Sequence, residues 1–409
     1  MANQKILVGI DVGTSKIRTV VGLVEDKKSL INIVGIGISP SEGLRKGMIT
    51  DIDEAVSNIT ASLDDAERMA GEQIHRAYVS TSGSHIETYD SKGVIAINGH
   101  NAEITEEDVD RVLDAAQTVS LPSNRDILRI IPKSFAVDSQ RGIKYPVGMT
   151  GIRLEVEAHI ITGQSAAIKN LEKCMYQTGI DTQEITPSIL ACAESVLDRK
   201  QRELGSVLLE IGASCTNMAV FEEGSVIYSS VIPVGGSHVT NDLAIGLRCS
   251  IDTAEKVKIE YGTCLHDDIS DREEIDLSQI SKTDAHSVSK KQASKIIEAR
   301  YHEIFLMVRD ELAKIGREGM LPAGVVLTGG AVKIPGCIEL ARETLQLPAQ
   351  IGFPKDLEGI VDRVDDPSFA CCIGLLHFNN RYGVNKNFID FGFLKSFDRF
   401  GHWFKKLIP

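Results

Sequence analysis

The chain has 409 residues, of which 43% are hydrophobic and 25% charged, a composition typical of soluble globular proteins. It is too long for one ordinary hydrophobic core, so we expect two or more domains. The formal net charge of −13 argues against a general nucleic-acid-binding protein. The eight cysteines lack the paired spacing of a zinc site, and we expect neither a signal peptide nor a membrane-spanning helix. These features favour a reducing, cytoplasmic setting.

The stretch of residues 6–22 predicts a β-hairpin whose tip could bind an anion. An apolar run reaches Asp11, a Gly-Thr-Ser turn at residues 13–15 and then Lys16 follow, and a second run rich in β-branched residues leads away. Gly13 allows a tight turn with exposed N–H groups, Lys16 adds a positive charge for phosphate, and Asp11 could hold Mg²⁺ through water. The alternative is an ordinary hairpin with a polar tip.

The next part of the chain predicts a lobe that is interrupted by an insertion. The lobe continues with a strand at 30–38, a helix at 51–70 and a strand at 76–81. Residues 84–162 look like a self-contained α+β insertion. Its expected elements are a strand pair at 86–97 broken near Asp90 and Gly93, a helix at 106–119 capped by Thr105 and Asp108, and strands at 127–138 and 151–161.

After the insertion the α/β pattern resumes and repeats the plan of the opening hairpin. A strand at 206–211, a small-residue turn at 212–216 and a returning strand at 217–221 mirror the first hairpin, as expected for duplicated lobes. The other expected elements are helices at 166–178, 188–199, 238–247, 250–261, 293–316, 336–345 and 368–379, strands at 180–185, 225–233, 324–327 and 349–352, and a polar surface segment at 267–292.

Three glycine-bearing turns follow apolar strands, at residues 11–14, 210–214 and 327–330. None is a Walker A loop, and the sequence contains no GxGxxG pattern. In this order they resemble the two phosphate loops and the adenosine loop of the actin, Hsp70 and hexokinase superfamily, and residues 185–195 and 370–376 resemble its two connecting helices. The resemblance implies an α/β, two-lobed actin-like ATPase fold with an inserted α+β subdomain in the first lobe.

Within that superfamily the sequence resembles the FtsA family of bacterial cell-division proteins over nearly the whole chain. The most specific matches are residues 147–154 following 130–132, residues 232–236 with 239–242, and residues 254–255 with 258 and 261–262. The resemblance implies a first lobe at 1–83 and 163–195, the insertion at 84–162, a second-lobe core at 196–240 and 321–378, its outer subdomain at 241–320, a linker at 379–390 and a membrane-targeting helix at 391–409.

The resemblance also implies a site for ATP or ADP with Mg²⁺ between the lobes. The residues expected there are Asp11 (to Mg²⁺ through water), Gly13, Thr14, Ser15 and Lys16 in the first loop, Glu210, Gly212, Ala213, Ser214 and Thr216 in the second, Gly235, Gly236, Glu255 and Lys258 near the phosphates, ribose and base, and Gly329, Gly330 and Ala331 beneath the adenosine. For Glu255 and Lys258 the alternative is a solvated helix face.

The second loop and the first connecting segment depart from the superfamily pattern. Glu210 replaces the usual Asp, Ala213 and Ser214 replace two glycines that have ready access to positive φ, and Asn217 replaces the last Asp. Thr186 stands where relatives that hydrolyse ATP have Glu or Gln, and threonine is a poor general base. We therefore predict no catalytic residue, and we expect ATP to bind and to be hydrolysed slowly or not at all.

Residues 391–409 predict a basic amphipathic helix of the kind that anchors proteins at a membrane surface. Apolar side chains recur at steps of three and four residues, and the cations lie towards the other side with a single acid, Asp398. The apolar positions are Phe393, Leu394, Phe397, Phe400, Trp403, Phe404 and Leu407, and the cations are Lys395, Arg399, Lys405 and Lys406. The alternative is a terminal helix docked on the protein's own core.

The resemblance implies an ATP-binding, polymerising adaptor that ties FtsZ to the cytoplasmic face of the membrane at the division site. The implied partners are the FtsZ C-terminal peptide on the outer subdomain, further copies of the chain in a filament, anionic lipid at the tail, and later division proteins on the insertion. The alternatives are a pilus-assembly scaffold, which lacks such a tail, and a small-molecule kinase or chaperone-type ATPase, which needs a catalytic carboxylate.

Overall fold

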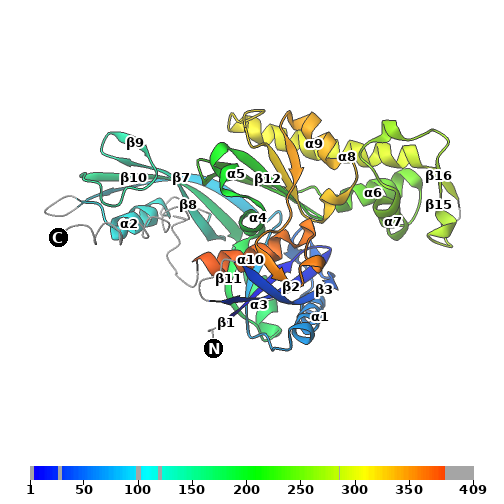
Figure 1. The fold of residues 1–409 in the computed structure, drawn as a ribbon, viewed down its shortest axis with the longest axis horizontal. Coiled ribbons are helices and arrows are strands. Elements are labelled where there is room, and N and C mark those ends of the chain that lie inside the picture. The colour runs from blue at the N-terminus through cyan, green and yellow to red at the C-terminus, as the bar shows by residue number, and fades with distance from the viewer. Residues whose placement is uncertain (1–3, 26–29, 98–102, 118–121, 285, 383–409) are drawn as a thin grey trace.

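The computed structural model describes residues 4–25, 30–97, 103–117, 122–284 and 286–382, and these form two lobes that each carry a further subdomain. In Figure 1 the first lobe lies at the bottom and the second above it, with the insertion extending to one side and the outer subdomain to the other. This arrangement confirms the predicted two-lobed α/β fold. None of the described helices is both long and apolar enough to cross a bilayer.

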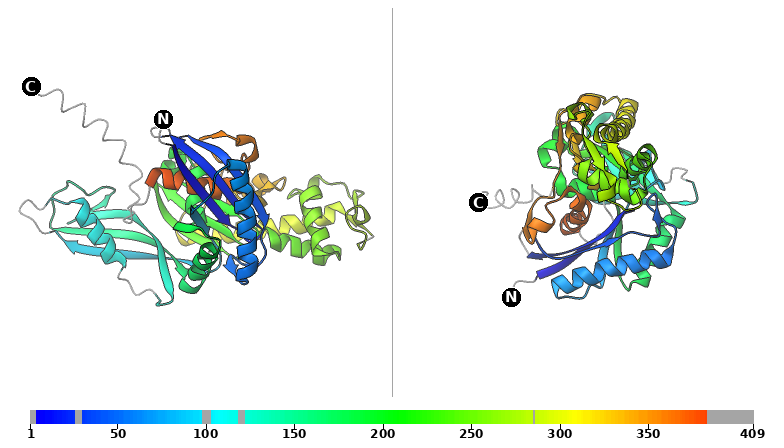
Figure 2. Two further views of the ribbon diagram at one scale, coloured as in Figure 1. Left: turned by 90° about the horizontal axis from the view of Figure 1, so that it is seen from below. Right: turned by 90° about the vertical axis from the view of Figure 1, so that its right-hand side faces the viewer.

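The first lobe is built on a six-stranded mixed sheet with the order β11-β6-β1-β2-β3-β19. Its strands are β1 (Gln4–Val12), β2 (Lys16–Glu25), β3 (Ile31–Pro40), β6 (Arg76–Thr81), β11 (Asp181–Pro187) and β19 (Leu357–Gly359). Helices α1 (Ile52–Ala70) and α3 (Ser165–Gln177) cover one face, and α10 (Ala370–Tyr382) packs on the other (Figure 2). The β1–β2 pair confirms the predicted opening hairpin.

The second lobe has a five-stranded sheet with the order β14-β13-β12-β17-β18. Its strands are β12 (Ser206–Ile211), β13 (Thr216–Glu222), β14 (Ser225–Ile232), β17 (Val325–Thr328) and β18 (Ala349–Ile351). One face packs on helices of the outer side, including α9 (Cys337–Leu345), and the other packs on α4 (Ser188–Val196). Since α4 also packs closely on α10, these two helices form the layer between the lobes.

Each lobe carries a subdomain with its own elements. In the insertion, α2 (Glu106–Gln117) packs on a sheet with the order β7-β10-β8-β9. These strands are β7 (Ile86–Ala96), β8 (Arg125–Val137), β9 (Gln140–Ile143) and β10 (Arg153–Gln164). The outer subdomain contains α6 (Gly236–Leu247), α7 (Ile251–Tyr261), α8 (Lys290–Lys314) and a small hairpin of β15 (Glu274–Asp276) and β16 (Ser287–Ser289).

Local signals in the sequence explain several helix starts. Asp51 caps α1 by accepting a hydrogen bond from the Glu54 backbone N–H at 3.1 Å. The predicted capping pair of α2 is confirmed, because the Thr105 hydroxyl accepts from the Asp108 N–H at 3.3 Å and the Asp108 carboxylate accepts from the Thr105 N–H at 3.0 Å. Ser250 caps α7 because its hydroxyl accepts from the Thr253 backbone N–H at 3.2 Å.

Several predicted boundaries differ from the structure. The strand pair at 86–97 is the single strand β7, in which Gly93 lets α2 come close; a Cβ there would lie 2.1 Å from the Val112 carbonyl oxygen. The helix at 188–199 ends at Val196, because Leu197 is extended and Asp198 starts a new helix, α5 (Arg199–Leu204). Helix α10 extends to Tyr382, into the predicted linker. Strand β19, from the stretch assigned to the second lobe, pairs with β3 of the first.

Candidate nucleotide site

The first loop joins β1 to β2 at the end of the first-lobe sheet that faces the second lobe. The register pairs Val12 with Ile17, so Gly13, Thr14 and Ser15 form the turn and Lys16 begins β2 with an exposed side chain. A Cβ at Gly13 would lie 2.8 Å from the Lys16 carbonyl oxygen. Glycine is therefore needed here for a close approach of the backbone.

Asp11 is anchored by a serine that the sequence analysis did not identify. The Ser80 hydroxyl, near the end of the neighbouring parallel strand β6, donates to Asp11 Oδ1 at 2.7 Å and accepts from the Val12 N–H at 3.3 Å. Asp11 is partly buried at this position. A carboxylate fixed in this way keeps a defined orientation, as a group that holds Mg²⁺ through water would require.

The second loop joins β12 to β13 and meets the first loop directly. The register pairs Ile211 with Thr216, and the Gly212 N–H donates to the Cys215 carbonyl at 2.9 Å. The Ser214 hydroxyl lies 2.9 Å from the Thr14 hydroxyl, a contact between the two lobes. Neither Ala213 nor Ser214 has positive φ, so this backbone does not require the glycines that the superfamily pattern has there.

Glu210 is held in the layer between the lobes. Its Oε2 accepts from the Ser188 hydroxyl at 2.6 Å and from the Asn217 side-chain amide at 2.9 Å. One of its carboxylate oxygens also lies within 4.8 Å of the thiols of Cys192 and Cys371, on α4 and α10. Burial, with the nearby Asp11 carboxylate, raises the pKa of Glu210 to about 7. The Oε2 atom of Glu210 therefore already has two hydrogen-bond donors within the layer between the lobes.

The first connecting segment offers no carboxylate at its critical position. Thr186 is buried near the end of β11, and its hydroxyl donates to Glu184 at 3.5 Å. Glu184 in turn pairs with Arg129 of the insertion. This arrangement gives Thr186 a structural contact, and a threonine hydroxyl is itself a poor general base.

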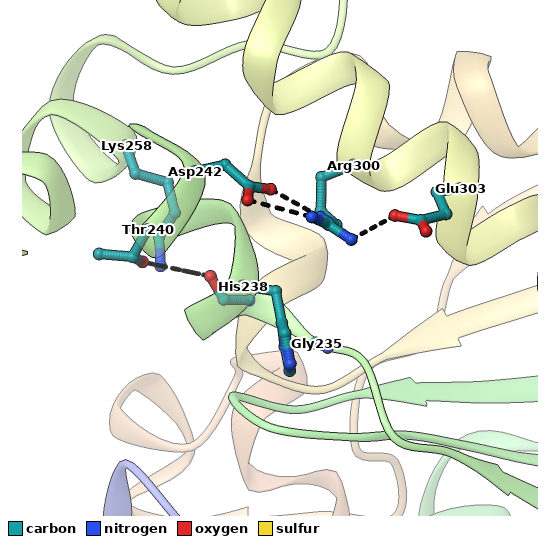
Figure 3. Close-up of polar contacts among 8 residues, drawn as sticks. Gly235, His238, Thr240, Asp242, Lys258, Arg300 and Glu303 are labelled. Atoms are coloured by element: carbon teal, nitrogen blue, oxygen red, sulfur yellow. Dashed lines mark hydrogen bonds and ion pairs between the residues drawn. The ribbon is translucent and has the colours of Figure 1, made fainter. Parts of the chain in front are cut away.

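The turn before α6 packs against the second loop. The Gly236 N–H donates to the Gly212 carbonyl at 2.9 Å, and a Cβ at Gly235 would lie 2.6 Å from the same oxygen. The Gly235 N–H donates to His238 Nδ1 at 3.1 Å, which closes the first turn of α6 (Figure 3). The N-terminus of α6, with its partial positive charge, therefore lies beside the second loop. The Thr216 hydroxyl donates to the Val234 carbonyl at 2.8 Å.

Lys258 fixes this turn from the neighbouring helix α7. It is 9% exposed, and its Nζ donates to the Gly236 carbonyl at 3.2 Å, the Thr240 hydroxyl at 2.8 Å and Glu255 Oε2 at 2.6 Å. The Thr240 hydroxyl also contacts Glu255. The alternative that Lys258 lies on a solvated helix face is therefore wrong, because its side chain is buried and holds the Gly236 carbonyl.

The predicted adenosine loop lies against both preceding segments. Gly329 has a φ of 94°, and a Cβ there would lie 2.6 Å from the Ile211 carbonyl oxygen, so the position requires glycine. A Cβ at Gly236 would lie 3.1 Å from that of Ala331, whose carbonyl accepts from the Tyr301 hydroxyl at 2.5 Å. Gly330 is exposed. Three small-residue turns of the second lobe thus form one continuous surface.

Glycine turns, a helix N-terminus and serine and threonine hydroxyls converge where the two lobes meet, and features of these kinds occur in anion sites. In this structure the N–H groups of Gly212, Gly235 and Gly236 donate to groups of the protein itself. The structure brings together the predicted first loop, second loop, α6 turn and adenosine loop. It adds Ser80 and Ser188, whose roles depend on contacts between distant segments that no local signal reports. The predicted membrane contacts at residues 391–409 lie outside the described residues.

Comparison with known proteins identifies the family. A family model described as "Cell division protein FtsA" matches residues 207–374, and one described as "SHS2 domain inserted in FTSA" matches residues 83–162. FtsA of Pseudomonas aeruginosa is 38% identical over 382 residues, covering 93% of this chain and 90% of the relative. FtsA of Bacillus subtilis is 39% identical (92% and 84% covered), and that of Escherichia coli K12 is 32% identical (94% and 92%).

Solved structures with the same fold are more distant in sequence. The PilM-PilN type IV pilus biogenesis complex matches with a TM-score of 0.67 at 14% identity, covering 93% of this chain and 98% of that one. MreB5 of Spiroplasma citri bound to ADP matches with a TM-score of 0.53 at 13% identity, covering 92% and 96%. These likenesses show the actin-like fold alone. The relatives at 32–39% identity show more, and the chain belongs to the FtsA family of cell division proteins.

Proposed function

We propose that this protein is an ATP-binding, actin-like adaptor that polymerises on the cytoplasmic membrane and tethers FtsZ filaments to it during cell division. Membership of the FtsA family supports the division role. The observation that carries the nucleotide-dependent part is the contact between Thr14 and Ser214, which joins the two phosphate-type loops across the lobes. A ligand held by both loops would couple the lobes to each other.

Residues from both lobes would hold Mg²⁺–ATP or Mg²⁺–ADP. The first loop and Asp11 would serve the phosphates and the metal, the second loop would serve the phosphates from the opposite side, and the turns at 235–236 and 329–331 would accommodate the rest of the nucleotide. Bound nucleotide supplies an anion shared by the two lobes. We expect bound nucleotide to favour closure of the two lobes and thereby to favour assembly of the chain into filaments.

Hydrolysis is expected to be slow or absent. Thr186 cannot act as an effective base, and Glu210 is engaged by Ser188 and Asn217. ATP would then act mainly through its binding, and its hydrolysis would contribute little. A phosphate-release assay with turnover near about one per second, the lower range for phosphoryl-transfer enzymes, would contradict this part of the proposal.

The membrane part of the proposal rests on the sequence of residues 391–409. Each large apolar side chain contributes at most roughly 1.5–3 kcal/mol on burial, and partial immersion and helix ordering reduce this, so one tail should bind reversibly. A row of tails on a polymer would bind strongly through avidity. Because the body of the protein is acidic, the tail's lysines and arginines are needed to offset repulsion from anionic lipid.

The outer subdomain is the proposed docking surface for the FtsZ C-terminal peptide. It exposes three large apolar side chains, Ile245 (79% exposed), Ile251 (60%) and Ile259 (67%), on α6 and α7. The adjoining α8 presents Arg300, which pairs with Asp242 at 2.6 Å and also with Glu303 (Figure 3). Exposed apolar groups beside a fixed charge network suit a peptide with both apolar and charged side chains. The insertion would contact the neighbouring copy and later division proteins.

Electron microscopy on an anionic lipid monolayer tests the whole proposal. The full chain is expected to form filaments on the lipid with ATP, and to recruit labelled FtsZ C-terminal peptide. A variant lacking residues 391–409 is the matched control, and it should fail to pellet with liposomes while still binding nucleotide. Unchanged pelleting of this variant would refute the membrane assignment. The pilus-scaffold alternative, which has fold likeness alone in its support, predicts no lipid binding by either protein.

A further inference from the structure

A short hairpin after the first lobe's third strand carries a lysine in an unusual backbone conformation. Strands β4 (Leu44–Arg45) and β5 (Met48–Ile49) pair antiparallel, which leaves Lys46 and Gly47 as a two-residue turn. Both have positive φ, 52° for Lys46 and 77° for Gly47, as a type I′ turn requires. Asn, Asp or Gly adopts the first position readily, whereas lysine is strained there. Backbone strain of this kind is a pointer to function.

The tip of this hairpin is fixed tightly against the segment that follows β6. The Ser84 N–H donates to the Lys46 carbonyl at 3.3 Å. A Cβ at Gly47 would lie 2.0 Å from the Ser82 carbonyl oxygen, and one at Gly83 would lie 2.5 Å from that of Lys46. These close backbone contacts set the position of Lys46 in the lobe, although its side chain is exposed.

The same tip reaches the point where the two phosphate-type loops meet. The Gly47 N–H donates to the Thr14 hydroxyl at 3.2 Å, and that hydroxyl lies 2.9 Å from the Ser214 hydroxyl. Burial raises the pKa of the Cys215 thiol, the next residue of the second loop, and the positive charge of Lys46 opposes that rise. The backbone of the hairpin tip thus lies against the first loop, whose Thr14 contacts the second, with the exposed Lys46 at that tip.

We propose that Lys46 binds the terminal phosphate of the nucleotide and makes the site prefer a triphosphate over a diphosphate. This inference rests on the nucleotide site proposed above and adds a third arm, the hairpin at residues 44–49, to its two loops. A lysine suits the role because its ammonium is a compact charge on a flexible stem, which can follow a phosphate that is present in one ligand and absent in the other.

The test compares dissociation constants of the full-length protein for Mg²⁺–ATP and Mg²⁺–ADP by isothermal titration calorimetry. Lys46→Asn removes the charge and places at this position a residue that tolerates the left-handed conformation, so its thermal midpoint should equal or exceed that of the wild type. We expect it to weaken ATP binding about tenfold and ADP binding less than about twofold, as the loss of one charge-assisted contact predicts. Lys46→Arg should retain most of the preference.

Arg45→Gln is the matched control, since Arg45 is the exposed neighbouring cation, and it should leave both constants unchanged. If the ratio of the ATP and ADP dissociation constants in Lys46→Asn equalled that of the wild type, the inference would be overturned. This holds whether neither nucleotide is weakened or both are weakened equally, and nucleotide binding itself would stand. If the wild type bound neither nucleotide, the proposed function would fail, and the role of Lys46 would fail with it.

Discussion

Glu210 gives the sharpest test of the layer between the lobes. Its pKa is raised to about 7 from a model-compound value of 4.5, so the folded protein favours the protonated carboxyl. For a group of this kind the stabilisation is fully present below the unfolded pKa and is lost as pH rises through the folded pKa. Through this residue, the free energy of unfolding of the wild type should therefore fall between roughly pH 4.5 and pH 7, by at most about 3 kcal/mol. The fall should be smaller than this limit because Glu210 keeps some solvent contact.

Glu210→Gln keeps the shape of the side chain and removes its charge. Its oxygen can still accept from Ser188 and Asn217, so we expect the variant to gain about 2–3 kcal/mol relative to wild type between about pH 5 and pH 8. The assay is the difference in thermal midpoint at the two pH values without nucleotide. Glu260→Gln, at an exposed position on α7, is the control, and its thermal midpoint should differ from that of the wild type by the same amount at pH 5 and at pH 8. A Glu210→Gln midpoint below that of wild type at the higher pH would refute the reasoning.

Three further substitutions probe the surroundings of the site. Ser80→Ala should weaken Mg²⁺-dependent nucleotide binding several-fold in calorimetry, because Asp11 loses its anchor. It should also cost about 1–2 kcal/mol of stability without ligand, because Asp11 and the Val12 N–H lose a buried hydrogen-bond partner. Gly329→Ala should lower the free energy of unfolding by about 1–3 kcal/mol, since the position has positive φ and a Cβ would meet the Ile211 carbonyl. An unchanged thermal midpoint would contradict this. Lys258→Met should cost about 1–3 kcal/mol in thermal unfolding by leaving the Gly236 carbonyl without its donor, and Lys256→Met, on the exposed face of α7, should be close to neutral.

Local patterns in the sequence were sufficient for most of the helices and strands and for the glycine turns. The α2 capping pair and the opening hairpin depend on neighbours within a few residues, so their signals are complete in the sequence. Gly93 shows the limit of such signals. A glycine inside a strand pattern predicts a break in the strand, but Gly93 lies within β7, where the absence of a side chain lets α2 pack closely on the strand. Strand β19 likewise depends on a partner far away in the chain.

The same limit applies to the site. The residues on turns were predictable because small residues after an apolar strand have a local meaning, whereas Ser80, Ser188 and Lys46 gain their roles only from contacts between distant segments. Ser80 belongs to the strand beside β1, and Ser188 begins a helix of the layer between the lobes. The sequence predicts Glu210 in the second loop as a residue of the nucleotide site, and the structure shows that Ser188 and Asn217 engage its carboxylate.

The position of Glu210 connects ligand binding to the relation between the lobes. Ser214 contacts the first lobe's loop, and Glu210 contacts α4 through Ser188. The two residues lie in one strand and the turn that follows it, so only a short stretch of chain separates these contacts. A ligand that enters between Thr14 and Ser214 must displace that turn or the opposing loop. Displacement of the Ser214 turn would act on the segment that Glu210 joins to α4, and α4 packs on α10. If nucleotide binds as proposed, the turn that it contacts is connected through Glu210 and α4 to the last described helix, α10.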